Sequence, residues 1–220
     1  MIALANGNYL QPIPKQEACE FVKSLHYSKS VVWSSHTHLG VFVEGKIIGV
    51  LQFGPSMNPK ATSKVILGLP PAGMVELNRM AFLDGHPKNI VSESIAASFR
   101  FIRAVRPAVQ VVQSFADGRC KRLGVVYQAS NFIYLGSHKT IFYLLDGEWF
   151  HKSLLNRAPV DKRGWGSGPK AARFAAGKER AVPHEFEQFR YAYPLTPWAR
   201  RQLLPRALPY PKPEARNAIT

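Results

Sequence analysis

The chain has 220 residues, of which 46% are hydrophobic and 20% are charged. That is enough apolar material for a folded core, and it excludes wholesale disorder. The 29 Lys and Arg residues outnumber the 14 Asp and Glu residues, which leaves a formal charge of +15. The excess indicates a polyanionic partner, with nucleic acid favoured over a membrane surface, although a basic soluble surface of no special function has the same composition.

Several classes of protein are excluded by simple patterns. No apolar run approaches the roughly 18 residues of a membrane span, and the first residues lack the order of a signal peptide. The two cysteines, Cys19 and Cys120, form no CxxC pair, so we expect neither a disulfide scaffold nor a zinc finger. We find no P-loop and no Rossmann fingerprint. These patterns predict an intracellular protein.

The first 150 residues alternate helical and extended patterns. We expect, in chain order, a helix over 16–25, a hairpin of strands 38–43 and 46–53 turning at Glu44-Gly45, a strand over 75–83, a helix over 92–105 capped by Ser92, a strand over 109–115, a short helix over 120–129, and strands over 132–135 and 140–145. This order predicts a mixed α/β layer fold.

Charge and proline content divide the chain near residue 150. Residues 1–150 hold 15 basic and 9 acidic side chains, whereas residues 151–220 hold 14 and 5, together with 9 of the 17 prolines. We expect a catalytic domain over 1–150 and a basic, Pro-rich and aromatic-rich extension over 151–220. The extension would wrap the domain or contact nucleic acid. A solvated tail with aromatic side chains docked on the core is the alternative.

Two polar stretches lie in the first third of the chain. His26 and Tyr27 directly follow the first expected helix, where a histidine is suited to catalysis but also to hydrogen bonding the last helical carbonyls. The second stretch is the loop that begins at Gln52 and Phe53 and contains Asn58. Its amides could read a base edge, or they could serve ordinary turn chemistry.

Arg79 lies on an expected central strand, on the face opposite Glu76 and Asn78. A buried arginine without a partner is costly, so we expect a carboxylate or an anionic ligand beside it. A structural salt bridge with Glu93 or Asp117 is the alternative.

Two further stretches follow the expected strand 109–115. Ser114 and Asp117 lie at its carboxyl end, where ligands bind in open α/β sheets. Asp117 is therefore a candidate base or metal ligand, with a helix cap as the alternative. Tyr127 and Asn131 are four residues apart and would share one helix face.

The expected order of strands resembles the GNAT acyltransferase fold, in which a mixed sheet splays open to admit an acyl donor. More specifically, the chain resembles the Mom family of phage DNA-modification proteins. The resemblance spans roughly residues 20–145, and its carrying motifs are His26-Tyr27 and the segments 49–59 (GVLQFGPSMNP), 76–82 (ELNRMAF), 114–117 (SFAD) and 127–132 (YQASNF).

The resemblance implies modification of adenine in double-stranded DNA at N6, giving a carbamoylmethyl (acetamido) adduct that protects DNA from restriction in the cytoplasm of a bacterial host. It also implies a small-molecule group donor, such as acetyl-CoA or another acyl donor, and an iron centre. The implied iron ligands or proton-transfer groups are His26, Tyr27, Asp117 and Tyr127, and the implied supports of donor or substrate are Arg79 and Ser92. Such an enzyme would flip the base into a pocket, for which Gln52, Phe53, Asn58 and Tyr127 are suitable lining residues. The expected substrate-binding residues are Gln52, Phe53, Asn58, Ser114 and Asn131.

The chain departs from GNAT enzymes in one motif. Segment 118–124 (GRCKRLG) would be the turn that binds the pyrophosphate of CoA, but it has no second glycine in register. Arg119, Lys121 and Arg122 could still hold phosphate. Acetyl transfer alone would give an N-acetyl group, so the acetamido product requires further chemistry. The alternative functions are a non-catalytic DNA-binding protein and a GNAT-type acetyltransferase acting on a protein or small amine.

Overall fold

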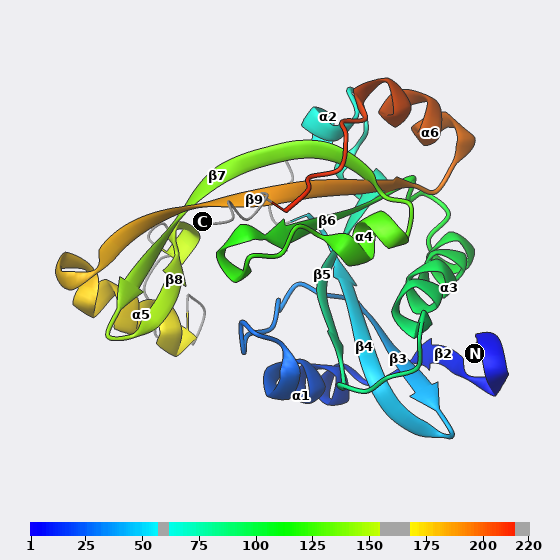
Figure 1. Ribbon diagram of the computed structural model, residues 1–220, viewed down its shortest axis with the longest axis horizontal. Coiled ribbons are helices and arrows are strands. Elements are labelled where there is room, and N and C mark those ends of the chain that lie inside the picture. Colours follow the sequence, from blue (N-terminus) through cyan, green and yellow to red (C-terminus); the bar gives the residue numbers. More distant parts are fainter. Residues whose placement is uncertain (57–61, 155–167, 214–220) are drawn as a thin grey trace, which may run out of the picture. The chain divides into compact units, whose positions relative to one another are not determined.

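The structure, a computed structural model, describes residues 1–56, 62–154 and 168–213 (Figure 1). The helices are α1 (Lys15–Leu25), α2 (Thr62–Val65), α3 (Ile90–Val105), α4 (Val125–Ala129), α5 (Gly168–Gly177) and α6 (Pro197–Leu203). The strands are β1 (Ile2–Ala3), β2 (Tyr9–Pro12), β3 (Thr37–Val43), β4 (Lys46–Gly54), β5 (Met74–Phe82), β6 (Val111–Asp117), β7 (Ile133–Leu145), β8 (Glu148–His151) and β9 (Val182–Pro194). No described helix is long and apolar enough to cross a membrane.

The strands form one mixed sheet in the order β1-β2-β3-β4-β5-β6-β9-β7-β8. Strands β1 to β5 pair antiparallel, and β5 pairs with β6 in parallel. The β3–β4 hairpin turns at Glu44 and Gly45, whose φ angles are 49° and 75°, as a tight hairpin requires. A bulge between Gln52 and Phe53 shifts the register of β4 on β5, so that Arg79 pairs with Gln52 and Glu76 pairs with Gly54. Arg79 and Glu76 therefore lie on one face of the sheet, and the expectation from strict alternation that they lie on opposite faces was wrong. The expected mixed α/β fold with helices flanking a central sheet is confirmed.

The chain folds into two compact units. Unit 1 contains Met1–Ala116, Leu123–Gly136 and Arg190–Thr220, and unit 2 contains Asp117–Arg122 and Ser137–Phe189. This division differs from the boundary expected at residue 150. Residues after 150 supply β9 and α6 as regular elements, because prolines stand where they are tolerated: Pro194 ends β9, and Pro197 opens α6 behind the Thr196 cap.

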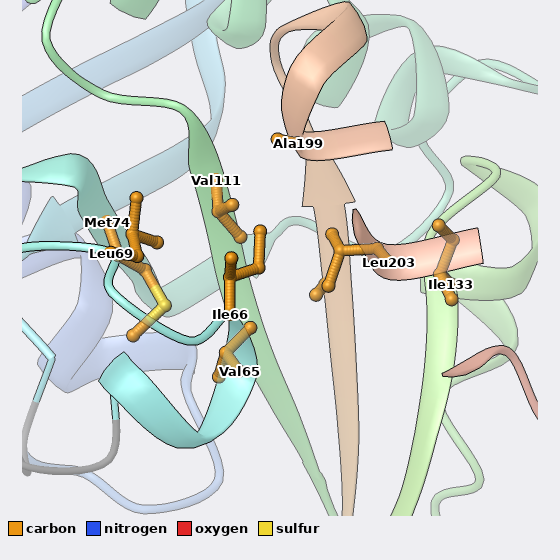
Figure 2. Packing of buried hydrophobic residues seen from close by; sticks show 9 residues of the cluster. Val65, Ile66, Leu69, Met74, Val111, Ile133, Ala199 and Leu203 are labelled. Carbon is orange, nitrogen blue, oxygen red and sulfur yellow. The ribbon is translucent and has the colours of Figure 1, made fainter. Parts of the chain in front are cut away.

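The core of unit 1 includes two apolar clusters. One lies under α2 and α6 and is shown in Figure 2; its members are Val65, Ile66, Leu69, Met74, Val111, Ile133, Ala192, Ala199 and Leu203. The other lies under α1 and joins Ala18 and Val22 to Val50 of β4 and Ala81 of β5. In unit 2, Phe150 and Phe174 stack with ring centroids 4.9 Å apart.

Most expected elements are confirmed within one or two residues, namely α1, β3, β4, β5, α3 and β6. Three details were wrong. Helix α3 begins two residues before Ser92, with Asn89 (φ 66°) at its N-cap position. The expected helix 120–129 is a 3-10 turn followed by the five-residue α4, and the two strands expected over 132–145 are the single strand β7.

We predict that Leu203→Ala lowers the free energy of unfolding by about 2–5 kcal/mol, because it removes a fully buried side chain from the α6 cluster. Leu208→Ala, at a side chain that is 50% exposed, serves as the control and should change stability by about 0.5 kcal/mol or less. Urea unfolding followed by circular dichroism measures both values. Equal effects of the two substitutions would show that α6 is not part of the cooperatively folded core.

Candidate active site

Strands β5 and β6 separate at the point where the candidate site begins. Their parallel ladder consists of three pairs, from Met74 with Val111 to Glu76 with Gln113. Just beyond the last pair, the fully buried Ser114 donates a hydrogen bond to the carbonyl oxygen of Leu77 at 2.9 Å. Ser114, expected to bind substrate, therefore fastens the two strands where the sheet opens.

Arg79 of β5 is the cation at the centre of the site. Its Nε donates to the Ser30 carbonyl at 2.8 Å, one terminal nitrogen donates to the Asn78 carbonyl at 2.6 Å, and the other donates to Ser30 Oγ at 3.2 Å. A guanidinium carries five N–H donors, so two remain for a ligand. Neither salt bridge considered from the sequence forms: Glu93 accepts from the Ala5 amide, and Asp117 pairs with Arg119.

A chain of hydroxyl groups connects Arg79 to His26. The Nδ1 atom of His26 lies 2.8 Å from Ser28 Oγ, which lies 3.1 Å from Ser30 Oγ, the atom that Arg79 contacts. The Ser28 backbone N–H also donates to His26 Nδ1 at 3.2 Å. Because Nδ1 accepts this hydrogen bond, a neutral His26 carries its proton on Nε2. No sequence motif marks Ser28 and Ser30, which lie in an ordinary polar loop.

Two tyrosines and a carboxylate lie near enough to the Arg79 guanidinium to act on it electrostatically. Partial burial lowers the pKa of Arg79, while Tyr27, Glu76 and Tyr127 act electrostatically to raise it. Tyr127 is buried on α4, whereas Tyr27 is 40% exposed and its ring lies 4.3 Å from that of His26. The structure therefore brings His26, Tyr27, Arg79 and Tyr127 together, and adds Glu76.

A polar row continues from Arg79 along the same face of the sheet. Gln52 is the register partner of both Arg79 and His38. It is fully buried, and its amide nitrogen lies 3.1 Å from His38 Nδ1 and 3.7 Å from Cys19 Sγ. An amide nitrogen only donates, so His38 Nδ1 must be the acceptor. Burial and the nearby Lys15 lower the pKa of His38, although a backbone hydrogen bond to Ser35 opposes the shift.

Asp117 lies in unit 2, where it caps a 3-10 turn. Its carboxylate accepts from the Arg119 backbone N–H at 3.0 Å and from the Arg119 side chain at 3.2 Å. The cap considered from the sequence is thus present, and a role for Asp117 in chemistry stays a prediction.

Three other expected site residues lie away from the Arg79 cluster, and a fourth is not described. Ser92 donates to the Asn89 carbonyl in the first turn of α3, and Phe53 is fully buried in the core. Asn131 is exposed at φ 60°, beyond the end of α4, so it shares no helix face with Tyr127. Asn58 lies outside the described residues.

The iron site expected at His26, Tyr27, Asp117 and Tyr127 stays a prediction, because Asp117 lies in unit 2 and the other three residues lie in unit 1. Within residues 1–56, 62–154 and 168–213, no group of three His, Cys, Asp or Glu side chains is placed to hold a metal ion. His26 Nδ1 already accepts a hydrogen bond from the Ser28 backbone N–H, and the Asp117 carboxylate accepts one from the Arg119 side chain.

In the segment expected to hold CoA phosphates, Gly118 and Arg119 contact other parts of unit 2. A Cβ atom at Gly118 would lie 2.5 Å from the Glu187 carbonyl oxygen, so this glycine allows close approach of β9. The Arg119 guanidinium lies over the rings of Phe142 and Trp149, at 4.8 and 5.7 Å. Lys121 and Arg122 remain exposed.

Known proteins resemble this chain in sequence and in fold. The model of the Mom protein family matches residues 8–212. The methylcarbamoylase mom of Escherichia phage Mu is 45% identical over 194 residues, which cover 87% of this chain and 78% of that protein.

Solved structures show the fold. The ribosomal L7/L12 alpha-N-protein acetyltransferase RimL, in complex with coenzyme A, has a TM-score of 0.50 at 12% identity, over 88% of this chain and 97% of that chain. An acetyltransferase of the GNAT family from Streptococcus pneumoniae has a TM-score of 0.46 at 10% identity, over 86% of this chain and 99% of that chain. The expected GNAT-like fold is confirmed.

We predict that acid destabilises the protein through His38. Because the pKa of His38 is lower in the folded chain, the unfolded chain binds a proton first as the pH falls through about 6.5. Stability should be fully present above that pH and should decline below it, until the pH passes the folded pKa. Urea unfolding between pH 8 and 5 measures this slope, which His38→Asn should reduce. The exposed His86→Asn is the control; an equal reduction by both variants would contradict the assignment.

Proposed function

The chain belongs to the Mom protein family, and we propose on that basis that it is a phage-type enzyme that converts adenine in duplex DNA to N6-carbamoylmethyladenine, protecting the DNA from restriction. The observation that carries the proposal is the 45% identity to the phage Mu methylcarbamoylase over most of both chains. Its setting would be the cytoplasm of a bacterial host.

The reaction needs a nucleophile that adenine supplies poorly. The N6 lone pair is delocalised into the ring, and N6 lies within the stacked duplex. The base is therefore flipped into a pocket, where fixed polar groups replace the lost pairing. N6 then forms a bond to the methylene carbon of the carbamoylmethyl group, the bond from that carbon to its leaving group breaks, and the N6 proton passes to a base.

The Arg79 cluster offers groups for charge and proton transfer. The two remaining N–H donors of Arg79 stabilise negative charge that develops on the donor molecule. Tyr27 and Tyr127 are hydroxyl groups beside this cation, and His26 presents Nε2–H as a donor. Asp117 of unit 2 is proposed as a base on the family resemblance, apart from the Arg79 cluster. No step is assigned to iron.

A small-molecule donor would enter the opening between β5 and β6, and the step above requires it to carry the carbamoylmethyl group with a leaving group on its methylene carbon. The methyl carbon of acetyl-CoA, the donor that the resemblance implies, has no such leaving group, so an acyl donor of that kind would need prior conversion. Support comes from the short ladder of three residue pairs and from the resemblance to the GNAT fold, whose sheet splays open to admit an acyl donor. Ser114 closes the inner end of this opening through its bond to Leu77. Because Arg119 is engaged with Asp117, Phe142 and Trp149, the phosphates of a CoA donor would need other partners.

The positive charge would hold the DNA backbone while the base is out of the stack. The residues of unit 1 carry a net charge of +10 and those of unit 2 a net charge of +5. Unit 1 includes Arg200, Arg201 and Arg206 from the second half of the chain. Both units would therefore contribute, and residues 151–220 would contact DNA through part of this charge.

Mass analysis of nucleosides tests the function directly. DNA from bacteria that express the chain should contain deoxyadenosine enlarged by one carbamoylmethyl group at N6, and DNA from cells with an empty vector should not. If all the adenine is unmodified although soluble, folded protein is present, the assignment as an enzyme is contradicted. DNA binding that persists without any adduct would instead favour a non-catalytic binding protein.

Two substitutions separate chemistry from capping at Asp117. We predict that Asp117→Ala and Asp117→Asn both lower the adduct level at least about 100-fold, with little change in DNA affinity. The Asn variant keeps an oxygen that can accept from the Arg119 backbone N–H, but it removes the base. A full adduct level in Asp117→Asn would assign this residue to the cap alone.

A further inference from the structure

One face of the sheet carries Gln52 and Gly54 of β4, and we name it face A. Gln52 is the register partner of Arg79, and Gly54 is the register partner of Glu76. Glu76 is paired in turn with Gln113 on β6, and their side chains approach to 3.4 Å. Two apolar clusters lie on this face, the α1 cluster beside Val50 and the α2–α6 cluster that includes Val111. Polar side chains thus occupy the part of face A between two packed regions.

Several buried polar atoms on face A lack hydrogen-bond partners within the part of the chain that the structure describes. They are Asn78 Nδ2, Gln113 Oε1, Arg190 Nε and Gln52 Oε1. Leaving a buried donor or acceptor unpaired costs about 1–3 kcal/mol, so several together in one region indicate a ligand that satisfies them. These side chains lie outside the hydroxyl chain from His26 to Arg79.

Three of these side chains lie on neighbouring strands. Asn78 is on β5, Gln113 is on β6 and Arg190 is on β9, which are adjacent in that order. Their unpaired atoms form the sequence donor, acceptor, donor, on strands spaced about 5 Å apart. Two contacts place Asn78 and Arg190 on face A. A Cβ atom at Gly54 would lie 2.8 Å from Asn78 Nδ2, and the Arg190 guanidinium lies 5.5 Å from the ring of Phe115, two residues after Gln113 on β6.

Adenine presents the complementary pattern. The N6 amine is a donor, and it projects between two ring acceptors, N1 and N7. Cytosine and guanine lack this alternation. Thymine has it, but its central N–H is recessed between two carbonyl oxygens. The central acceptor here is the deepest group, because Gln113 is 1% exposed, Asn78 is 8% exposed and Arg190 is half-buried. A projecting amine fits a recessed acceptor.

We propose that Asn78, Gln113 and Arg190 form the recognition site for the flipped adenine, with Gln113 Oε1 accepting a hydrogen bond from the N6 amine and the two flanking donors contacting N1 and N7. The inference rests on the proposed function and deepens it, by naming the residues that select the base. Gly54 contributes space, since a side chain there would collide with Asn78.

Glu76 connects this recognition site to the Arg79 cluster. It accepts from Gln113 Nε2 and interacts electrostatically with both Arg79 and Arg190. An amine held by Gln113 Oε1 therefore lies beside the guanidinium that the proposed chemistry uses. Glu76 also fixes the orientation of the Gln113 amide, because its carboxylate holds the NH₂ group and leaves the oxygen for the base.

Base analogues test the site on the unmodified full-length chain. Fluorescence anisotropy would measure binding to a cytosine oligonucleotide with one central adenine, purine (without the N6 amine), 7-deazaadenine (without N7) or thymine. Adenine should bind at least about tenfold tighter than each of the others, because each analogue leaves a buried partner unpaired. Equal affinities within twofold would overturn the proposal.

A matched pair of variants locates the effect. Gln113→Met keeps the side-chain volume but removes the acceptor, so its preference for adenine over purine should fall to near unity, while binding to the all-cytosine strand is unchanged. Gln202→Met, at an exposed position on α6, should keep the preference. Thermal unfolding confirms that both variants fold. A preference retained by folded Gln113→Met would also overturn the proposal.

Nucleoside analysis of the same proteins separates this proposal from the proposed function. If the wild-type chain forms the adduct but binds all the analogues equally, the proposed recognition site is contradicted and the proposed enzymatic function stands. If the wild-type chain binds adenine preferentially but forms no adduct, the recognition site stands and the proposed enzymatic function is contradicted.

Discussion

The partly buried guanidinium of Arg79 is the constraint on which the site depends. A cation removed from water needs oxygen atoms around it, and the chain supplies them from the loop after α1 and from β5 itself. Holding Arg79 therefore fixes the loop that carries His26, Tyr27, Ser28 and Ser30. Because no carboxylate forms an ion pair with Arg79 in the described parts of the chain, the cation stays available to an anionic ligand.

The GNAT-like sheet explains why polar groups gather at this place. Strands β5 and β6 part after Glu76 and Gln113, so side chains at the junction face an opening rather than a continuous ladder. The bulge at Gln52 and Phe53 changes the alternation of β4 against β5. It brings Gln52 opposite Arg79 and Gly54 opposite Glu76. Donor binding and base recognition are thereby proposed for one region of unit 1.

Local patterns predicted much of the fold and part of the site. Helical periodicity found α1 and α3, and the Glu44-Gly45 turn found the hairpin, because both signals lie within a few residues. The role of β9 was missed, since its pairing joins residues far apart in sequence. The motif with Arg79 was predicted by resemblance, but Ser28, Ser30 and Gln113 were not, because their contacts depend on strand register and on a loop conformation that no short pattern encodes. The prediction that Asn131 shares a helix face with Tyr127 was wrong, because α4 ends two residues before Asn131.

The most direct measurement is the amount of N6-carbamoylmethyladenine formed by a folded Arg79→Lys variant, with the exposed Arg100→Lys as its control. Lysine keeps the charge but cannot hold two serine contacts, a backbone carbonyl and a ligand at once. The adduct should fall at least about 100-fold in Arg79→Lys and stay near the wild-type level in Arg100→Lys. A wild-type adduct level in folded Arg79→Lys would contradict the assignment of the Arg79 cluster as the reacting centre.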